Sequence, residues 1–347
     1  MSDPMGMGKL VDGIPEQIGK ALEHAAMNPW NLPRRDPSVV VVGAMGGSAI
    51  AAELTAGLYS DTLPWPLLVV RDYRWPAFVN REAFAVLSSY SGGTEETLAL
   101  YDQAQRRSVP RAALTTGGAM AVMCDRDGVP WWPLPRGLPP RAALFSSWVP
   151  LTLLIAALGG CPDPTAGWNE AMEALRALRA RIGTAVPEER NPARQLARSL
   201  VGRTLFLYSA TERMGAVATR LRQQLNENAK LLAHAASVPE LNHNEIVGWE
   251  SPEAIHRGAT VLILRDAEDS PEAARRLAFT RDYVARQGAG LAELDPGSGS
   301  RLARMAGHVM FGDYLSFYLA LARGVDPSPV ASIDEFKRRM AEADRET

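Results

Sequence analysis

Short apolar runs alternate along this chain with longer segments whose apolar positions recur at helical spacing. In the first half, extended runs are expected at 38–42, 65–71, 83–88, 111–115 and 131–135, with helices at 48–59 and 95–107. Apolar runs bounded by turn residues are typical of buried strands, and strands that alternate with helices indicate a parallel sheet. The first half therefore predicts an α/β fold, a mainly parallel sheet with helices on both faces in a three-layer αβα arrangement.

The same alternation restarts after a charged helical segment around 171–182. Strands are expected at 203–208, 260–264 and 290–294, and helices at 214–235, 271–287, 301–323 and 332–343. A chain of this length suits two domains. We divide it into a helical lead (1–36), a first α/β domain (37–160), a helical connector (161–192), a second α/β domain (193–325) and a C-terminal helix (326–347).

One uncharged stretch, residues 142–162, is long enough to be compared with a membrane span. Pro150 lies inside it and Gly159–Gly160 close it. We interpret the stretch as a buried helix that begins near Ser147, with Pro150 in its first turn and the glycines at its C-terminal cap. No membrane association is expected.

Composition narrows the classes of protein to consider. The 347 residues carry a net charge of −2, which gives no reason to expect a nucleic acid or an anionic membrane as partner. The two cysteines, Cys124 and Cys161, form no CxxC pair, and the five histidines show no metal-ligand spacing. A reducing cytoplasm is the expected location, and no metal site is expected.

Two loops combine glycines with hydroxyl residues directly after an apolar run. The first lies in VVVVGAMGGSA (39–49) and the second in AVLSSYSGGTEET (85–97). Glycine lets the backbone approach an anion, hydroxyls donate hydrogen bonds, and a helix N-terminus offers free N–H groups. The candidate phosphate ligands are Gly46, Gly47, Ser48, Ser89, Ser91 and Thr94.

Helix capping is the alternative explanation for these hydroxyls, since Ser48 could be an ordinary N-cap and Ser91 or Thr94 could serve α-helix capping as well. Two such loops on neighbouring strands favour phosphate. Neither nucleotide motif, G-x-x-x-x-G-K-[ST] or G-x-G-x-x-G after a strand, is present, so the phosphate need not belong to a nucleotide. The second domain keeps only a faint echo of the loop at 209–212.

Three other polar segments could supply catalytic groups. Glu227 is flanked by asparagines in RLRQQLNENAK, and a carboxylate fixed by amides in a cleft could act as a general base, although a solvated helix face explains the same pattern. His243 in ELNHNEIVGW could transfer protons near neutral pH, although a lone histidine is more often structural. Arg141 in the proline-rich PRGLPPRAA could face an anion or belong to a simple surface loop.

Over residues 37–340 the chain resembles the bifunctional phosphoglucose/phosphomannose isomerases, a branch of the sugar isomerase (SIS) domain superfamily. The resemblance rests, in chain order, on GAMGGSAI, SYSGGTEET, PRAAL, QLNENAK, ELNHNEIVGW and RGVDPSPV followed by Lys337. The 16-residue step from Glu227 to His243 joins its two best-matched motifs. Two positions depart from the expected pattern: Gly93 stands where an asparagine is expected, and the first loop reads GAMGGS instead of the shorter GMGGS.

The resemblance implies two SIS domains and a homodimer with active sites at the subunit interface, without a cofactor. It implies that the hydroxyl residues hold a sugar phosphate and that Glu227 moves a proton between C1 and C2. Arg141 would stabilise the enediolate, and His243 from the partner subunit and Lys337 would assist ring opening. The implied reaction interconverts glucose 6-phosphate or mannose 6-phosphate with fructose 6-phosphate through a cis-enediol. A non-catalytic sugar-phosphate-binding protein and an SIS isomerase for another sugar phosphate remain alternatives.

Overall fold

The computed structural model describes residues 3–32, 36–211, 213–250, 254–295 and 297–346 and contains two parallel sheets. The first has the order β2-β1-β3-β4-β5, and its strands are β1 (Val40–Ala44), β2 (Leu67–Val70), β3 (Phe84–Ser89), β4 (Arg111–Thr115) and β5 (Trp131–Pro133). The second has the order β7-β6-β8-β9, with β6 (Thr204–Ala210), β7 (Ala233–Val238), β8 (Ala259–Leu264) and β9 (Gly290–Leu294). The predicted fold class is confirmed.

Helices cover both faces of each sheet, as the continuous apolar strands β1, β3 and β8 require. The first half contributes α1 (Met7–Asp12), α2 (Ile14–Met27), α3 (Gly46–Leu58), α4 (Glu95–Arg106), α5 (Gly118–Asp127), α6 (Leu144–Ala157) and α7 (Thr165–Ile182). The second contributes α8 (Pro192–Ser199), α9 (Met214–Glu227), α10 (Ala254–Gly258), α11 (Pro271–Arg286), α12 (Arg301–Arg323) and α13 (Ala331–Glu346). Short 3₁₀ turns are η1 (Pro140–Ala142), η2 (Glu188–Arg190), η3 (Glu240–His243) and η4 (Glu245–Trp249).

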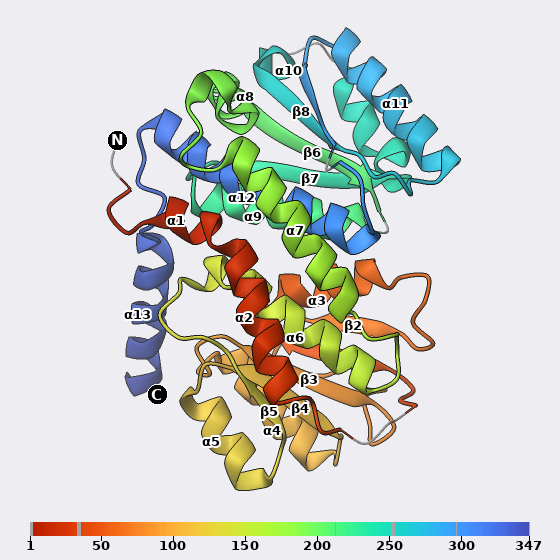
Figure 1. Cartoon of the computed structure of the whole chain (residues 1–347), viewed down its shortest axis with the longest axis vertical. Coiled ribbons are helices and arrows are strands. Elements are labelled where there is room, and N and C mark those ends of the chain that lie inside the picture. Colours follow the sequence, from red (N-terminus) through yellow and green to blue (C-terminus); the bar gives the residue numbers. More distant parts are fainter. Residues whose placement is uncertain (1–2, 33–35, 212, 251–253, 296, 347) are drawn as a thin grey trace.

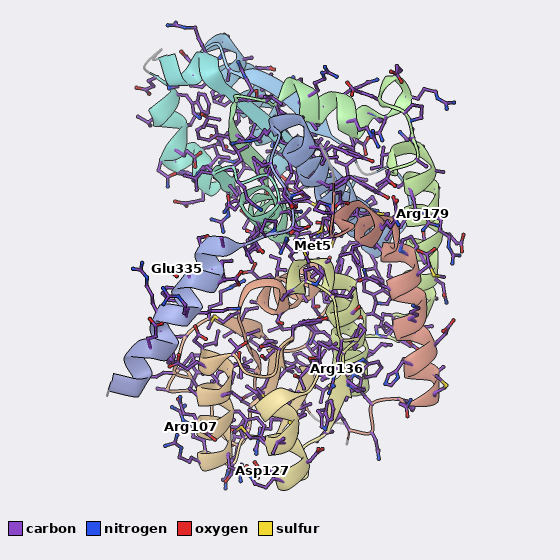
Figure 2. All side chains as sticks on the ribbon, turned by 90° about the vertical axis from the view of Figure 1, so that its left-hand side faces the viewer. Met5, Arg107, Asp127, Arg136, Arg179 and Glu335 are labelled. Atoms are coloured by element: carbon purple, nitrogen blue, oxygen red, sulfur yellow. The ribbon has the colours of Figure 1, made fainter. Side chains whose placement is uncertain are left out.

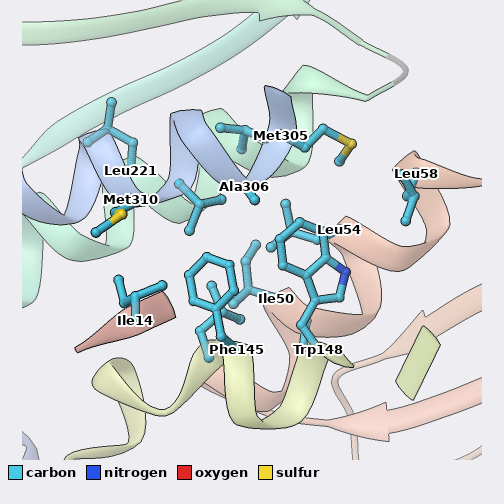
Figure 3. Close-up of a cluster of buried hydrophobic side chains, with 14 of the residues drawn as sticks. Ile14, Ile50, Leu54, Leu58, Phe145, Trp148, Leu221, Met305, Ala306 and Met310 are labelled. Carbon is cyan, nitrogen blue, oxygen red and sulfur yellow. The ribbon is translucent and has the colours of Figure 1, made fainter. Parts of the chain in front are cut away.

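A continuous apolar core joins the inner faces of the two sheets. It is built from helices that lie between the sheets in Figure 1, and Figure 3 shows part of it, with Ile50 and Leu54 of α3 beside Phe145 and Trp148 of α6. Met310 of α12 belongs to the same buried cluster. Two smaller apolar clusters lie elsewhere, one on the first sheet and one on the second. The sheets are therefore held as one packed unit, which fixes any site between them.

Helices α3 and α9 pack against each other in this central layer and run in opposite directions. At one end, Arg141 of η1 donates a hydrogen bond to Asn228, the residue that follows α9. At the other end, Glu268 pairs both with Arg213 at the start of α9 and with Arg301, which in turn binds Asp61 just beyond the end of α3. The start of α3 therefore lies on the same side of the molecule as the end of α9.

One predicted helix, 214–235, is wrong in its second half. The helix α9 ends at Glu227, and residues Ala233–Val238 form β7, which pairs in parallel with β6. Alanine and leucine favour helix, so the local pattern hides this alanine-rich edge strand. The break occurs where Lys230 adopts a positive φ of 52°, and tertiary pairing with β6 then overrides the local preference.

The uncharged stretch forms α6, which begins at Leu144 rather than near Ser147, so Pro150 lies inside the helix. Burial of the added first turn, with Leu144 and Phe145 in the core, outweighs the hydrogen bond that the proline removes. Gly159 and Gly160 end the helix as predicted: Gly159, at φ 92°, donates to Ala156 and Gly160 donates to Ile155. Among the described residues, no helix combines the length and apolar character needed to cross a membrane.

Candidate active site

The first glycine-rich loop connects β1 to α3. Gly46 opens the helix at a positive φ of 48°, and a Cβ on Gly47 would lie 3.1 Å from the carbonyl oxygen of Pro140. Ser48 is the third residue of α3 and is nearly buried, so the N-cap position belongs to Met45 and not to this serine. In the part of the chain that the structure describes, no side chain caps α3. The Ser48 N–H donates to the carbonyl oxygen of Met45 at 3.1 Å, so the N–H groups of Gly46 and Gly47 are the ones that the helix start offers to an anion.

The second loop is organised around Ser89, the last residue of β3. Its Oγ accepts hydrogen bonds from the backbone of Gly92 (3.1 Å) and Thr94 (3.4 Å) and lies 2.8 Å from Thr94 Oγ1. Gly92 has a φ of 70°, and a Cβ there would lie 1.8 Å from Gly117 O, so only glycine fits. Ser91 is exposed and accepts from Gly93 at 3.3 Å. Ser89 thus shapes the loop, while Ser91 and Thr94 reach its surface.

Strand pairing brings the two loops together. Ala44 at the end of β1 is in register with Ser88 near the end of β3, and neighbouring strands lie about 4.8 Å apart. This position is also where the strand order reverses, the usual ligand crevice of an open α/β sheet. The loops offer backbone donors from the starts of α3 and α4 and hydroxyls from Ser48 and Thr94, a donor set suited to a phosphate.

Arg141 lies beside the first loop, in the η1 turn that packs on α3. Its side chain is 5% exposed and is held by Asn228 Oδ1 and the carbonyl oxygens of Pro327 and Ser328 at 2.6–2.8 Å. Burial lowers the pKa of Arg141, and the Glu227 carboxylate opposes that shift. A guanidinium remains charged in either case. Sequence reasoning left open whether Arg141 belongs to a surface loop, and the structure buries it.

Glu227 is the last residue of α9 and faces the same region. Its Oε2 lies 3.8 Å from Arg141 Nη1, and the side chain is 33% exposed. The end of the helix is closed by Lys230, whose Nζ donates to the Glu227 carbonyl oxygen. The structure thus gathers Glu227 and Arg141 next to the first loop, with a carboxylate that is partly open to solvent and a cation that is rigidly held.

His243 and Lys337 are not brought to Glu227 by close contact in the described chain. Glu227 precedes β7 and His243 follows it, so a six-residue strand of about 20 Å separates their positions. His243 is exposed in η3. Lys337 is exposed on α13, the helix at the edge of the molecule that Figure 2 marks with Glu335. Both side chains face outward from this single chain.

Sequence reasoning missed the buried polar residues behind Arg141. Arg220 and Gln224 on α9 and Asn228 directly after it recur every four residues, and all three are at most 2% exposed. The pattern resembled a solvated helix face, yet Arg220 and Gln224 bind Asp313 of α12. The available signal was their strict four-residue spacing beside a leucine-rich face. It did not distinguish a buried polar stripe from a solvated one.

The second-domain echo of the phosphate loop has other partners. Ser209 Oγ lies 3.0 Å from Ser237 Oγ, and Thr211 Oγ1 donates to Val238 O at 2.6 Å; residue 212 lies outside the described part of the chain. Within the described ranges, no group of three or more potential ligands is arranged to hold a metal ion. A depression of about 860 Å³ between α7 and residues 183–192 contains none of the predicted site residues.

A family model and the curated relatives that cover most of the chain point to the same family. Residues 189–340 match the family described as bacterial phospho-glucose isomerase C-terminal SIS domain. A bifunctional phosphoglucose/phosphomannose isomerase from Caldicellulosiruptor bescii is 38% identical over 97% of this chain and 99% of its own. One from Thermoplasma volcanium is 30% identical over 87% of this chain and 91% of its own.

Solved structures support the fold. A crystal structure of a candidate phosphosugar isomerase from Silicibacter pomeroyi superimposes with a TM-score of 0.71 at 22% identity, covering 93% of this chain and 99% of that one. At that identity the likeness speaks for the fold alone. With the near-full-length sequence match, the conclusion is firm: this chain belongs to the bifunctional phosphoglucose/phosphomannose isomerase family.

Proposed function

We propose that this protein is an aldose–ketose isomerase that interconverts glucose 6-phosphate and mannose 6-phosphate with fructose 6-phosphate. Family membership supports the reaction class. The observation that carries the proposal is the placement of the Glu227 carboxylate 3.8 Å from the buried Arg141 guanidinium, beside the open start of α3. A base, a fixed cation and a phosphate-binding edge are the parts that the reaction needs.

In the proposed mechanism, Glu227 removes the proton from C2 of the open-chain aldose phosphate and returns it to C1. The electron pair of the C2–H bond forms the C1–C2 double bond of a cis-enediolate, while charge moves to the oxygen on C1. The hydroxyl proton on O2 then moves to O1 as Glu227 delivers its proton to C1, which leaves the C2 carbonyl of the ketose. A positioned base of this kind contributes about 10²–10⁴-fold to the rate. The partial exposure of Glu227 leaves its carboxylate accessible to substrate.

Arg141 would stabilise the enediolate oxygen as negative charge develops on it. The hydrogen-bond partners of its Nε and Nη2 are neutral oxygens, so its charge remains available to the reacting oxygen. Its rigid hold means that little reorganisation is needed during the reaction. Since a planar enediol loses the C2 stereocentre, rotation about C2–C3 would let the same base serve both glucose and mannose phosphates.

The phosphate would anchor the substrate at the two loops. Gly46 and Gly47 would present backbone N–H groups, while Ser48, Ser91 and Thr94 would donate hydroxyls and Ser89 would hold the second loop in shape. Binding energy from this remote group would orient C1 and C2 against Glu227. Gly93 would act only through its backbone, so the asparagine expected there is not needed for the cradle.

We further propose a homodimer in which each active site is completed by the partner. His243 is exposed and lies one strand length from Glu227, which supports a role of this histidine in the neighbouring subunit's site. There it would assist ring opening, with Lys337 of α13 in the same role. Two SIS domains with the boundaries given above and a cytoplasmic location complete the proposal.

A coupled assay tests the proposed activity. Purified protein is supplied with glucose 6-phosphate or mannose 6-phosphate, and fructose 6-phosphate is measured by its consumption in a coupled kinase reaction. Turnover of both substrates is expected, without added metal or redox cofactor for the isomerase step. Absence of turnover with both hexose phosphates would refute the proposal.

A subunit-mixing experiment tests the shared site. Glu227→Gln and His243→Ala variants, each with low activity, are mixed under conditions that allow subunits to exchange. If His243 acts in the partner's site, each mixed dimer regains one intact site, and activity rises toward one quarter of the wild-type value. If mixing restores no activity while mixed dimers form, His243 does not act across the interface.

A further inference from the structure

The guanidinium of Arg141 is fixed on two of its three edges. Nε donates to Asn228 Oδ1 at 2.8 Å, and Nη2 donates to the carbonyl oxygens of Pro327 (2.8 Å) and Ser328 (2.6 Å). Because the group is planar, these bonds set the direction of the remaining nitrogen. That nitrogen, Nη1, is the one that lies 3.8 Å from Glu227 Oε2. The face that Arg141 presents to the crevice is therefore determined by its partners.

Of these three hydrogen-bond partners of Arg141, Asn228 is the one that contacts it through a side chain. A second hydrogen bond holds that side chain at its other end. It is fully buried, and its Nδ2 donates to Ser316 Oγ at 3.0 Å. Ser316 in turn donates to the carbonyl oxygen of Asp313 at 2.9 Å. One end of the carboxamide thus faces α12 and the other faces Arg141. The sequence places Asn228 directly after Glu227, so one turn of chain carries both groups.

A buried ion pair supports the same arrangement from behind. Arg220 donates to both carboxylate oxygens of Asp313 at 3.0–3.2 Å and also to the carbonyl oxygen of Arg141 at 2.6 Å. Gln224 donates to Asp313 at 2.8 Å. Burial raises the pKa of Asp313, and the Arg220 charge with its hydrogen bond opposes that shift. The Arg141 backbone and side chain are thus both tied to α9 and α12.

We infer that Asn228 is a positioning residue that aims the Arg141 guanidinium at the enediolate and couples it to Glu227. The inference rests on the proposed isomerase function. If Asn228 only filled a buried space, the other partners of Arg141 would set the direction of its guanidinium. Here, removal of the Asn228 acceptor leaves Nε buried without its partner and frees the guanidinium to turn about its Nη2 contacts. Misplacement by about 1 Å can cost about 100-fold in rate.

The experiment compares Asn228→Ala with the matched control Asn226→Ala, which removes an exposed asparagine two residues earlier, in the last turn of α9. Fructose 6-phosphate formation from glucose 6-phosphate is measured to separate kcat from KM. Asn228→Ala is expected to lower kcat about 10–100-fold and to change KM less than about twofold, because the phosphate loops lie on other elements. Asn226→Ala is expected to match the wild type. A kcat of Asn228→Ala within twofold of the wild-type value would overturn the inference.

A double-mutant cycle separates positioning from packing. Lysine has no Nε donor, so in an Arg141→Lys background the Asn228→Ala change is expected to alter kcat less than about twofold. The same loss in both backgrounds would overturn the inference, because it would show that Asn228 acts without Arg141. If the wild-type protein isomerised neither hexose phosphate, the proposed function would be wrong. If the wild type is active and Asn228→Ala leaves kcat unchanged, only the inference about Asn228 would be wrong.

A nearly isosteric variant gives a second readout should Asn228→Ala not fold. In Asn228→Leu, the side chain keeps nearly the same shape but offers no acceptor to Arg141 Nε. Its kcat is expected to fall about 10–100-fold, with KM changed less than about twofold. A kcat within twofold of the wild-type value would contradict the positioning role.

Discussion

The two sheets carry very different residues at the carboxyl ends of their central strands. In the first sheet, the crevice between the ends of β1 and β3 is lined by glycines and hydroxyls, and the start of α3 is uncapped by any described side chain. In the second sheet, the crevice between the ends of β6 and β8 faces the 265–270 loop, which carries three carboxylates. These are Asp266, Glu268 and Asp269. The same fold position would thus serve an outside anion in one half, whereas it holds carboxylates of the chain itself in the other.

Arginines hold these built-in carboxylates. Arg304 binds Asp266 through Nε and Nη2, each at 3.0 Å, and Glu268 at 2.7 Å. Arg301 binds Glu268 at 2.6 Å and also Asp61, which follows α3 of the first half. The second crevice therefore holds two carboxylates, Asp266 and Glu268, that are paired within the chain. It also fastens the end of α3 that lies opposite the candidate active site.

The difference shows how a repeated architecture can carry one site instead of two. An anion from solution binds where donors lack a resident partner, and a covalently attached carboxylate in that place competes with it permanently. The ion pairs of the second crevice would then hold α3 and α9 in fixed positions relative to each other. The uncapped edge would be free to bind and release phosphate. The following predictions test this division of roles.

The largest effect is expected at the base. Glu227→Gln removes the proton acceptor and retains the shape of the side chain, so kcat should fall about 10²–10⁴-fold. Inorganic phosphate, measured as a competitive inhibitor, should bind as it does to the wild type, because its proposed ligands lie on the loops. Isomerisation near the wild-type rate in Glu227→Gln would remove Glu227 from the mechanism.

In the second crevice, Arg304→Ala should act on stability. The side chains of Arg304 and Asp266 are 6% and 2% exposed, and loss of one partner from a buried ion pair costs about 3–5 kcal/mol. Urea unfolding at pH 7 should show that loss, while KM of the folded fraction stays unchanged. The exposed pair Arg275–Glu272 is the matched control, and Arg275→Ala should change stability by less than about 1 kcal/mol. An Arg304→Ala protein as stable as the wild type would mean that this edge is no anchor.

A smaller effect is expected from pH at the same edge. Burial raises the pKa of Asp266 and Glu268, but the hydrogen bonds and charges of Arg304 and its neighbours together outweigh burial, so both carboxyls have pKa values below their usual range. The Arg301 hydrogen bond also lowers the pKa of Asp61. Groups with lowered pKa contribute stability above their unfolded pKa and lose it as pH falls through the folded value.

Unfolding free energies measured from pH 7 down to pH 3 should therefore fall, and the fall should be shallower in Arg304→Ala, which has less of this stabilisation to lose. Burial raises the pKa of Asp269 and so gives a contribution of opposite sign. The difference between variant and wild type isolates the Arg304 contribution from it. Parallel pH curves for the two proteins would contradict the assignment.

Much of the fold could be predicted because local patterns and tertiary structure agree. Strand 290–294 and helix 301–323 have the observed bounds, since each is a clear apolar pattern between turn residues. The strand β7 could not be predicted, because its alanines favour helix and its identity depends on pairing with β6. Long-range partners decide such segments, and one sequence does not reveal them.

The candidate site also combines features that the sequence predicts with features that depend on long-range contacts. The loop at 88–94 could be anticipated from its glycines and hydroxyls, yet the role of Ser89 as a buried organiser depends on contacts that composition does not give. The hydrogen bond between Arg141 and Asn228 spans 87 positions, and no local pattern encodes it. The asparagines beside Glu227 were expected to hold its carboxylate; Asn228 instead holds Arg141.

The smallest effect is expected from single hydroxyls of the phosphate loops. Thr94→Ala should raise KM for glucose 6-phosphate about 2–10-fold with kcat largely retained, because one hydrogen bond contributes about 0.5–1.5 kcal/mol. Ser89→Ala should raise KM as well, since its Oγ orders the Gly92 and Thr94 backbone. Both changes are expected to act on KM, because the phosphate that binds this loop is not the part of the substrate that reacts.

Thr211→Ala is the matched control in the second crevice. Thr211 follows β6 and donates to Val238 within its own half, so its loss should leave KM unchanged. If Thr94→Ala and Ser89→Ala also leave KM unchanged, the phosphate binds elsewhere. If instead Thr211→Ala raises KM as much as they do, both crevices bind anions and the contrast between the two edges does not hold.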